Sequence, residues 1–255
     1  AWTIAGYMAE RGELASPPGE QQDADATDAS GTPDARRARA FFEQAAAAGD
    51  ALAQAKLAHM LLDGVGGARA TGRAFDLFTA AAGQGLTAGF SGLAYLYEAG
   101  IGTRQNLELA RHWRERAAEA GDLDAQRHLA IDARARKDSA GLARWLSKAA
   151  AQKDLWALNA YAWMLSTARE PSSRDGTRAL LYAQRAVALR RSASHLDTLA
   201  AASAETGQFT AAVELQREAL RLVPAETESA EARAALRAEL EERLATYQQG
   251  RPWRE

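Results

Sequence analysis

Four isolated histidines and two glycine-rich stretches are the features of this sequence that could support catalysis or metal binding. The histidines are His59, His112, His128 and His195. None has a partner at metal-ligand spacing, because the chain holds no HExxH motif and no two histidines four residues apart. Residues 89–93 (GFSGL) lack the second glycine of a nucleophile elbow, and residues 64–67 (GVGG) lack the spacing of a phosphate loop. We therefore predict no enzymatic activity, no metal and no cofactor.

Composition excludes several further classes of protein. The chain has 255 residues and a formal net charge of −2, so no overall positive field attracts nucleic acid. It holds no cysteine and no run of 18 apolar residues, so disulfides, thiol chemistry and a membrane span are excluded. Alanine accounts for 63 residues and proline for six, a balance that favours helix.

A repeat of constant 36-residue spacing sets the expected architecture. One of its positions is held by alanine and another by a large apolar residue, followed by an alanine pair and a closing glycine. These positions are Ala38, Ala74 and Ala110; Phe41, Leu77 and Trp113; Ala45–Ala46, Ala81–Ala82 and Ala117–Ala118; Gly49, Gly85 and Gly121. The small residues share one helical stripe and permit close helix packing, and the bulky residue is expected to fill the gap between layers. Each closing glycine suits a left-handed helix cap.

The second half of the unit repeats as well, and it completes a family pattern. Its positions are Leu57, Leu93 and Leu129, Gly64 and Gly100, and Gly66 and Gly102. Together these residues resemble the Sel-one-like repeat, a solenoid relative of the tetratricopeptide repeat. The resemblance implies an all-α fold, an α-solenoid (superhelix) of stacked helix-turn-helix repeats, with about six helix pairs and a C-terminal capping helix.

We divide the chain into three parts. Residues 1–154 carry Sel-one-like repeats, interrupted at 15–35 by an acidic insertion with no large apolar side chain, which we predict to be disordered. Residues 155–226 resemble tetratricopeptide repeats, with Leu196, Gly207 and Pro224 at signature positions. Residues 227–255 form the capping helix and a tail.

The resemblance implies a partner-binding concave face formed by the first helix of each repeat. The positions that would line it are His59, Ser91, Tyr95, Arg127, Ile131, Trp156, Asn159, Trp163 and Asp197. Trp156, Asn159 and Trp163 are three and four residues apart and so share a helix face, where they could stack on a partner and hydrogen-bond its backbone. The alternative is that one or both tryptophans fill the core between repeats.

These features predict a non-catalytic interaction module that binds a protein or peptide partner through its concave face. The family resemblance implies an adaptor in a bacterial cell-envelope, signalling or secretion-linked process. Two alternatives stay open: an immunity-type inhibitor of one cognate toxin or enzyme, and the regulatory part of an enzyme whose catalytic residues precede residue 1. We expect a monomer that binds no nucleic acid. A mature chain beginning at Ala1 fits the periplasm somewhat better than the cytoplasm, although a trimmed cytoplasmic protein also fits.

Overall fold

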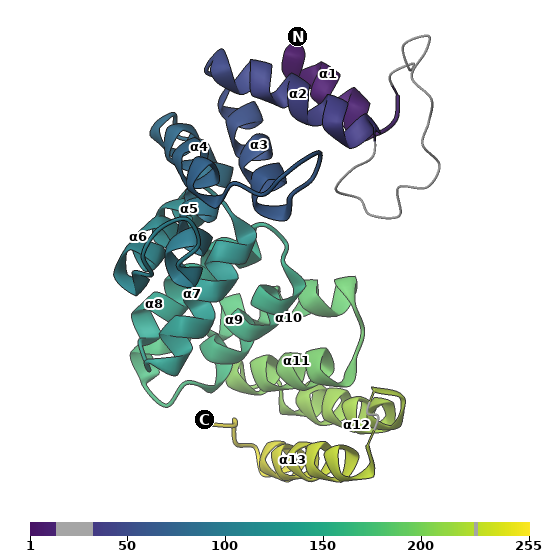
Figure 1. The fold of residues 1–255 in the computed structure, drawn as a ribbon. Helices are drawn as coiled ribbons and strands as arrows, with labels where there is room; N and C mark the ends of the chain where they lie inside the picture. Colours follow the sequence, from purple (N-terminus) through teal and green to yellow (C-terminus); the bar gives the residue numbers. More distant parts are fainter. Residues whose placement is uncertain (14–32, 227–228) are drawn as a thin grey trace. The chain divides into compact units, whose positions relative to one another are not determined.

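The structure is a computed structural model that describes residues 1–13, 33–226 and 229–255. In these residues the chain forms thirteen α-helices and a short 3-10 helix, with no strand. The chain divides into two compact units, unit 1 at Ala1–Ala125 and unit 2 at Gln126–Glu255. Within each unit, helices that follow one another in the sequence pack together (Figure 1). The predicted all-α solenoid is confirmed.

Helices alternate between the first and the second helix of a repeat, called here A and B helices. Unit 1 holds α1 (Trp2–Glu10), α2 (Pro33–Ala47), α3 (Ala51–Asp63), α4 (Thr71–Gly83), α5 (Thr87–Ala99) and α6 (Leu107–Glu119). Helix α7 (Leu123–Ala135) begins in unit 1 and continues into unit 2. Unit 2 adds α8 (Ser139–Ala151), α9 (Leu155–Thr167), η1 (Pro171–Ser173), α10 (Gly176–Leu189), α11 (Ala193–Glu205), α12 (Phe209–Glu226) and α13 (Ala230–Gln248). Odd-numbered helices from α1 to α11 are the A helices, which makes six A–B pairs followed by α13.

The alanine and leucine positions of the repeat form the core, as the spacing predicts. Ala38, Ala74 and Ala110 are buried, and so are Leu57, Leu93 and Leu129. The bulky position behaves differently, because Phe41, Leu77 and Trp113 are only half-buried. In two repeats the next residue, Phe42 or Phe78, is fully buried in their place. A shift of one residue rotates a side chain by about 100° around a helix, which carries these rings from the edge of the stripe to its centre.

Most repeats end at a residue with a left-handed backbone conformation, and in one repeat this residue is not glycine. Gly121 has a φ of 96°, and Lys153, which occupies the corresponding position one repeat later, keeps a φ of 63°. Gly102 has a φ of 69°, and a Cβ there would lie 2.4 Å from the Thr71 carbonyl oxygen. The glycine at 102 is therefore required twice, by its conformation and by the close approach of α4.

The predicted disordered insertion at 15–35 lies almost entirely outside the described residues. Its last three residues belong to α2, which begins at Pro33, a residue type favoured at the first position of a helix. At the other end of the chain, α13 packs against α12, and it buries Leu240 and Tyr247 among apolar residues of α11 and α12. Most of its other residues are exposed, as the polar outer face of a cap requires.

Candidate partner-binding surface

The residues predicted to line the concave face all lie on A helices, but their environments differ widely. In unit 1 they are His59 on α3 and Ser91 and Tyr95 on α5. In unit 2 they are Arg127 and Ile131 on α7, Trp156, Asn159 and Trp163 on α9, and Asp197 on α11.

Unit 1 brings its three predicted residues together. His59, Ser91 and Tyr95 line one pocket of about 540 Å³ between α3 and α5, which also includes the loop residues Arg69 and Ile101. Tyr95 leaves 53% of its surface exposed at this pocket. A half-exposed tyrosine presents both an apolar ring and a hydroxyl to solvent at this pocket.

His59 sits against an aromatic ring at the base of this pocket. Its imidazole meets the ring of Phe78 edge to face, with 5.0 Å between centroids. Desolvation lowers the pKa of His59 below 6.5, while the Asp63 carboxylate opposes that shift and the Lys56 ammonium adds to it. The ring is therefore uncharged at neutral pH and can both donate and accept a hydrogen bond.

Ser91 and Arg127 occupy equivalent positions in successive A helices, and both contact the residue that precedes the next A helix. Ser91 donates to Asp122 Oδ2 at 2.6 Å, and Arg127 forms an ion pair with Asp154. Each aspartate uses its other oxygen to accept an N–H in the first turn of its helix, from Ala125 and Ala157 respectively. The two predicted residues thus hold adjacent repeats together, and only part of each side chain faces solvent.

Asp197 occupies the same repeat position on α11, but it is only 7% exposed. It accepts a hydrogen bond from Gln216 of α12 at 2.8 Å and lies 3.4 Å from Arg243 of α13. Burial raises the pKa of Asp197 to about 6, against the opposing effects of Arg243 and the Gln216 hydrogen bond. The expectation that Asp197 lines an open face is therefore not met, since α12 and α13 cover it.

The predicted α9 face is divided between solvent and core. Trp156 is 37% exposed, whereas Asn159 is half-buried with its Oδ1 unpaired in the structure described. Trp163 is half-buried against the cluster that contains Ala200, Ala201 and Tyr247. Trp156 is thus exposed to solvent, whereas Trp163 is partly covered within unit 2.

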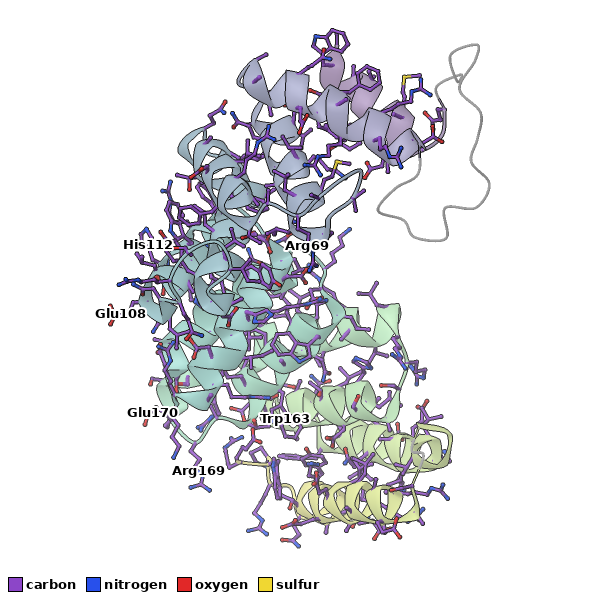
Figure 2. The ribbon with its side chains drawn as sticks, viewed as in Figure 1. Arg69, Glu108, His112, Trp163, Arg169 and Glu170 are labelled. Carbon is purple, nitrogen blue, oxygen red and sulfur yellow. The ribbon has the colours of Figure 1, made fainter. Side chains whose placement is uncertain are left out.

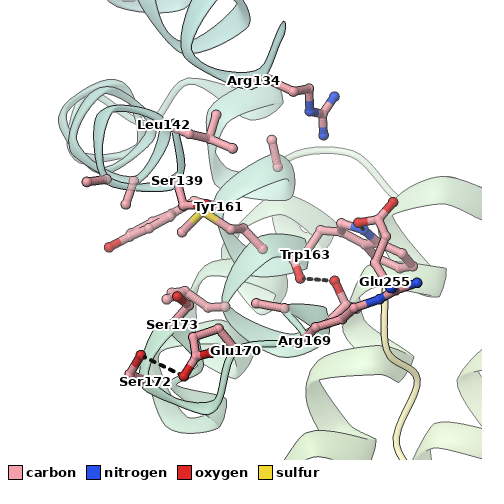
Figure 3. A pocket seen from close by; sticks show the side chains of 17 residues that line it. Arg134, Ser139, Leu142, Tyr161, Trp163, Arg169, Glu170, Ser172, Ser173 and Glu255 are labelled. Atoms are coloured by element: carbon pink, nitrogen blue, oxygen red, sulfur yellow. Dashed lines mark hydrogen bonds between the residues drawn. The ribbon is translucent and has the colours of Figure 1, made fainter. Parts of the chain in front are cut away.

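A segment that the repeat pattern does not reveal completes the surroundings of Trp163. Residues 249–255 turn back from α13, and Glu255 Oε2 accepts a hydrogen bond of 2.6 Å from the Trp163 indole. Both residues line a pocket of about 730 Å³ in unit 2, together with Arg134, Tyr161, Arg169 and Glu170 (Figure 3). The only signal for this contact in the sequence is an aromatic residue, Trp253, in a short stretch beyond the last helix.

The remaining candidates for chemistry are dispersed. His112 and Glu108 both project from α6 (Figure 2), and the centroid of the His112 ring lies 5.4 Å from that of the Trp113 ring. His195 is buried and bonded to the Ser192 hydroxyl that caps α11. Within 1–13, 33–226 and 229–255, no three His, Asp or Glu side chains gather closely enough to hold a metal ion. None of the described helices combines the length and apolar character needed to cross a bilayer.

The repeat geometry agrees with a known family. The family model described as Sel1 repeat matches residues 29–50, 51–86, 91–122, 143–154 and 157–189, which together exceed half of the chain. The chain belongs to the Sel1 repeat family. Repeats of this family generally mediate protein–protein interactions, and the fold is typically a non-catalytic scaffold. The last matched stretch lies within 155–226, where the change to tetratricopeptide-type repeats stays a prediction.

Two solved structures share the fold of this Sel1 repeat chain. One is a Sel1 repeat protein from Oxalobacter formigenes, with 19% identity, a TM-score of 0.57 and 86% coverage of both chains. The other is a protective antigen present in uropathogenic Escherichia coli strains, with 20% identity and a TM-score of 0.61. That match covers 94% of this chain and 53% of the antigen, so the chain spans about half of it. No curated protein matches the sequence.

Proposed function

We propose that this protein is a non-catalytic adaptor, monomeric on its own, that binds a protein partner on the surface formed by its A helices. The supporting observation is the unit 1 pocket, where His59, Ser91 and Tyr95 from two successive A helices converge. The family supports a protein as the ligand. Tyr95 is the central residue of this proposal because it combines large exposed area with a place at the pocket.

Unit 2 adds exposed apolar side chains on its own A helices. Ile131 on α7 is 57% exposed and Trp156 on α9 is 37% exposed. Apolar side chains of this size contribute most to binding when a partner buries them. Each unit therefore offers contact points of its own to a partner.

We place this binding in a bacterial cell-envelope, signalling or secretion-linked process, with the periplasm as the favoured compartment. A fold shared with a protective antigen of a pathogenic bacterium is consistent with that setting. An inhibitor of one cognate toxin or enzyme would use the same surface, and it would differ by capturing a single partner with high affinity.

Site-specific photocrosslinking tests the proposal. A benzoylphenylalanine at position 95 should crosslink a partner in cells that produce the protein, and Tyr95→Ala should reduce recovery of that partner at least tenfold in affinity capture. The matched control is position 107, because Leu107 on the B helix α6 is 65% exposed and outside the pocket. Crosslinks of equal yield at 95 and 107, or capture that Tyr95→Ala leaves unchanged, would contradict a partner site at the unit 1 pocket.

A further inference from the structure

In unit 2, residues 249–255 lie across the C-terminal ends of two A helices, α9 and α11. The Glu255 N–H donates to the Thr167 carbonyl at 2.9 Å, and Arg254 Nη1 donates to the Ser166 carbonyl at 3.0 Å. Both acceptors lie in the last turn of α9, whose final carbonyls have no partner within their own helix. The segment thus binds partly through backbone groups that would accept the N–H or guanidinium of other peptides.

Two side chains of the segment occupy distinct subsites. Trp253 packs on the apolar cluster of α11, α12 and α13, and the Arg243 guanidinium lies over the rings of both Trp163 and Trp253, at 5.1 and 5.7 Å. Arg254 Nη2 lies 2.6 Å from Glu205 Oε2 at the end of α11. Together with the Trp163–Glu255 hydrogen bond, these contacts select an aromatic residue, then a basic one, then an acidic one.

The pocket that Glu255 and Trp163 line extends past the contacts made by residues 253–255. Beyond Glu255, the 730 Å³ pocket continues between α8, α9 and the turn at 168–173, where Arg134, Tyr161 and Glu170 line it. Figure 3 shows Glu255 at one side of this pocket, beside Trp163.

We propose that unit 2 holds a binding site for an extended peptide of the order Trp–Arg–Glu, and that residues 253–255 occupy this site in cis. A partner segment of the same chemistry must displace them before it binds. This inference rests on the proposed function, because the ligand is a protein segment. It adds the sequence class of that ligand and the autoinhibition of the unit 2 site by residues 253–255. The short connection from α13 gives the cis segment an effective concentration on the order of millimolar, so a peptide at micromolar concentration should not compete.

The test uses the full chain with Trp253→Ala, Arg254→Ala and Glu255→Ala combined, which empties the site without shortening the protein. The probe is a fluorescein-labelled peptide with the sequence of residues 248–255, QQGRPWRE, followed by fluorescence anisotropy. We expect the triple variant to bind this peptide at least tenfold more tightly than the unaltered chain does. The same peptide carrying the three alanines is the matched control and should not bind.

A second variant separates recognition from folding. Trp163→Phe, added to the triple variant, keeps an aromatic ring but removes the indole donor, and it should weaken peptide binding about fivefold while leaving the circular dichroism spectrum unchanged. If the triple variant does not fold, the Arg254→Ala/Glu255→Ala chain replaces it, because Trp253 then stays packed. Its cis segment keeps one of the three side-chain contacts, so the probe should still displace it more readily than it displaces the segment of the unaltered chain. A folded variant that shows no binding, or equal binding by the unaltered chain and the variant, would overturn the inference. The Tyr95 crosslinking result is independent of either outcome, because Tyr95 lies in unit 1.

Discussion

Ser91 donates a 2.6 Å hydrogen bond to Asp122, a residue 31 positions later that caps the next A helix. The same relation joins Thr3 to Asp50 at 2.8 Å and Arg127 to Asp154. At the equivalent pair Ala55 and Leu86, both partners are apolar. In these four pairs the donor and the capping acceptor occur together or are lost together, which identifies this repeat position as a tie between neighbouring repeats.

Removal of the tie should lower stability without unfolding a helix. Ser91→Ala should reduce the free energy of unfolding by about 1 kcal/mol, and Asp122→Ala by about 2 kcal/mol, because the aspartate is also the cap. Urea denaturation of both single variants and the double variant measures the coupling. Ser147→Ala is the control, since that hydroxyl bonds to the Arg144 carbonyl of its own helix. Strictly additive losses would show that Ser91 and Asp122 act independently.

Alanine substitutions at three glycines of unit 1 measure the cost of left-handed backbone strain separately from the cost of a steric contact. Gly102→Ala should cost at least about 2 kcal/mol, because it strains a left-handed residue and forces Cβ against the Thr71 carbonyl. Gly121→Ala, which has the strain but open space, should cost about 1 kcal/mol. Gly83→Ala in α4 has neither and should raise stability by about 0.5–1 kcal/mol. Equal effects at 102 and 121 in thermal unfolding would exclude the steric contribution.

The left-handed lysine after α8 offers a stabilising substitution. Lys153→Gly should raise the free energy of unfolding by a few tenths to about 1 kcal/mol, because glycine adopts a φ of 63° without strain but adds entropy to the unfolded chain. Lys148→Gly, within α8, should instead lower it by about 1 kcal/mol. Chemical denaturation measures the change in the free energy of unfolding for each variant. A decrease for both variants would mean that the Lys153 side chain stabilises the fold by more than its backbone strain costs.

Asp197 should make stability depend on pH in a direction opposite to that of most carboxyl groups. Its folded-state pKa of about 6 exceeds the ordinary 3.8 because burial outweighs Arg243 and Gln216, with Glu239 adding to the rise. The folded chain therefore holds the proton more tightly, and stability falls as pH rises from about 4 to about 6, then levels. The free energy of unfolding of the unaltered chain, minus that of Asp197→Asn, should decrease over this interval. A difference that increases from pH 4 to 6 would show that the ion pair with Arg243 dominates.

Helix positions, the buried alanine stripe and the repeat-closing glycines follow from the sequence, because each depends on residues within one 36-residue unit. Ala74 and Ala110 are buried, and Gly100 and Gly102 are left-handed, for reasons that neighbouring residues supply. The same local pattern places His59, Ser91 and Tyr95 on successive A helices, where they line one pocket. Repeat spacing was sufficient there because equivalent positions of stacked units lie next to one another.

Only the tertiary structure decided which of these positions a partner can reach. Asp197 is covered because Gln216 of α12 and Arg243 of α13, the helix that follows the last A–B pair, lie against it. Trp163 is bound by Glu255, 92 residues away, through a segment that no periodic pattern describes. Local periodicity determines which face a side chain occupies, whereas its burial depends on segments distant in sequence that fold over that face, and the composition of one repeat carries no information about them.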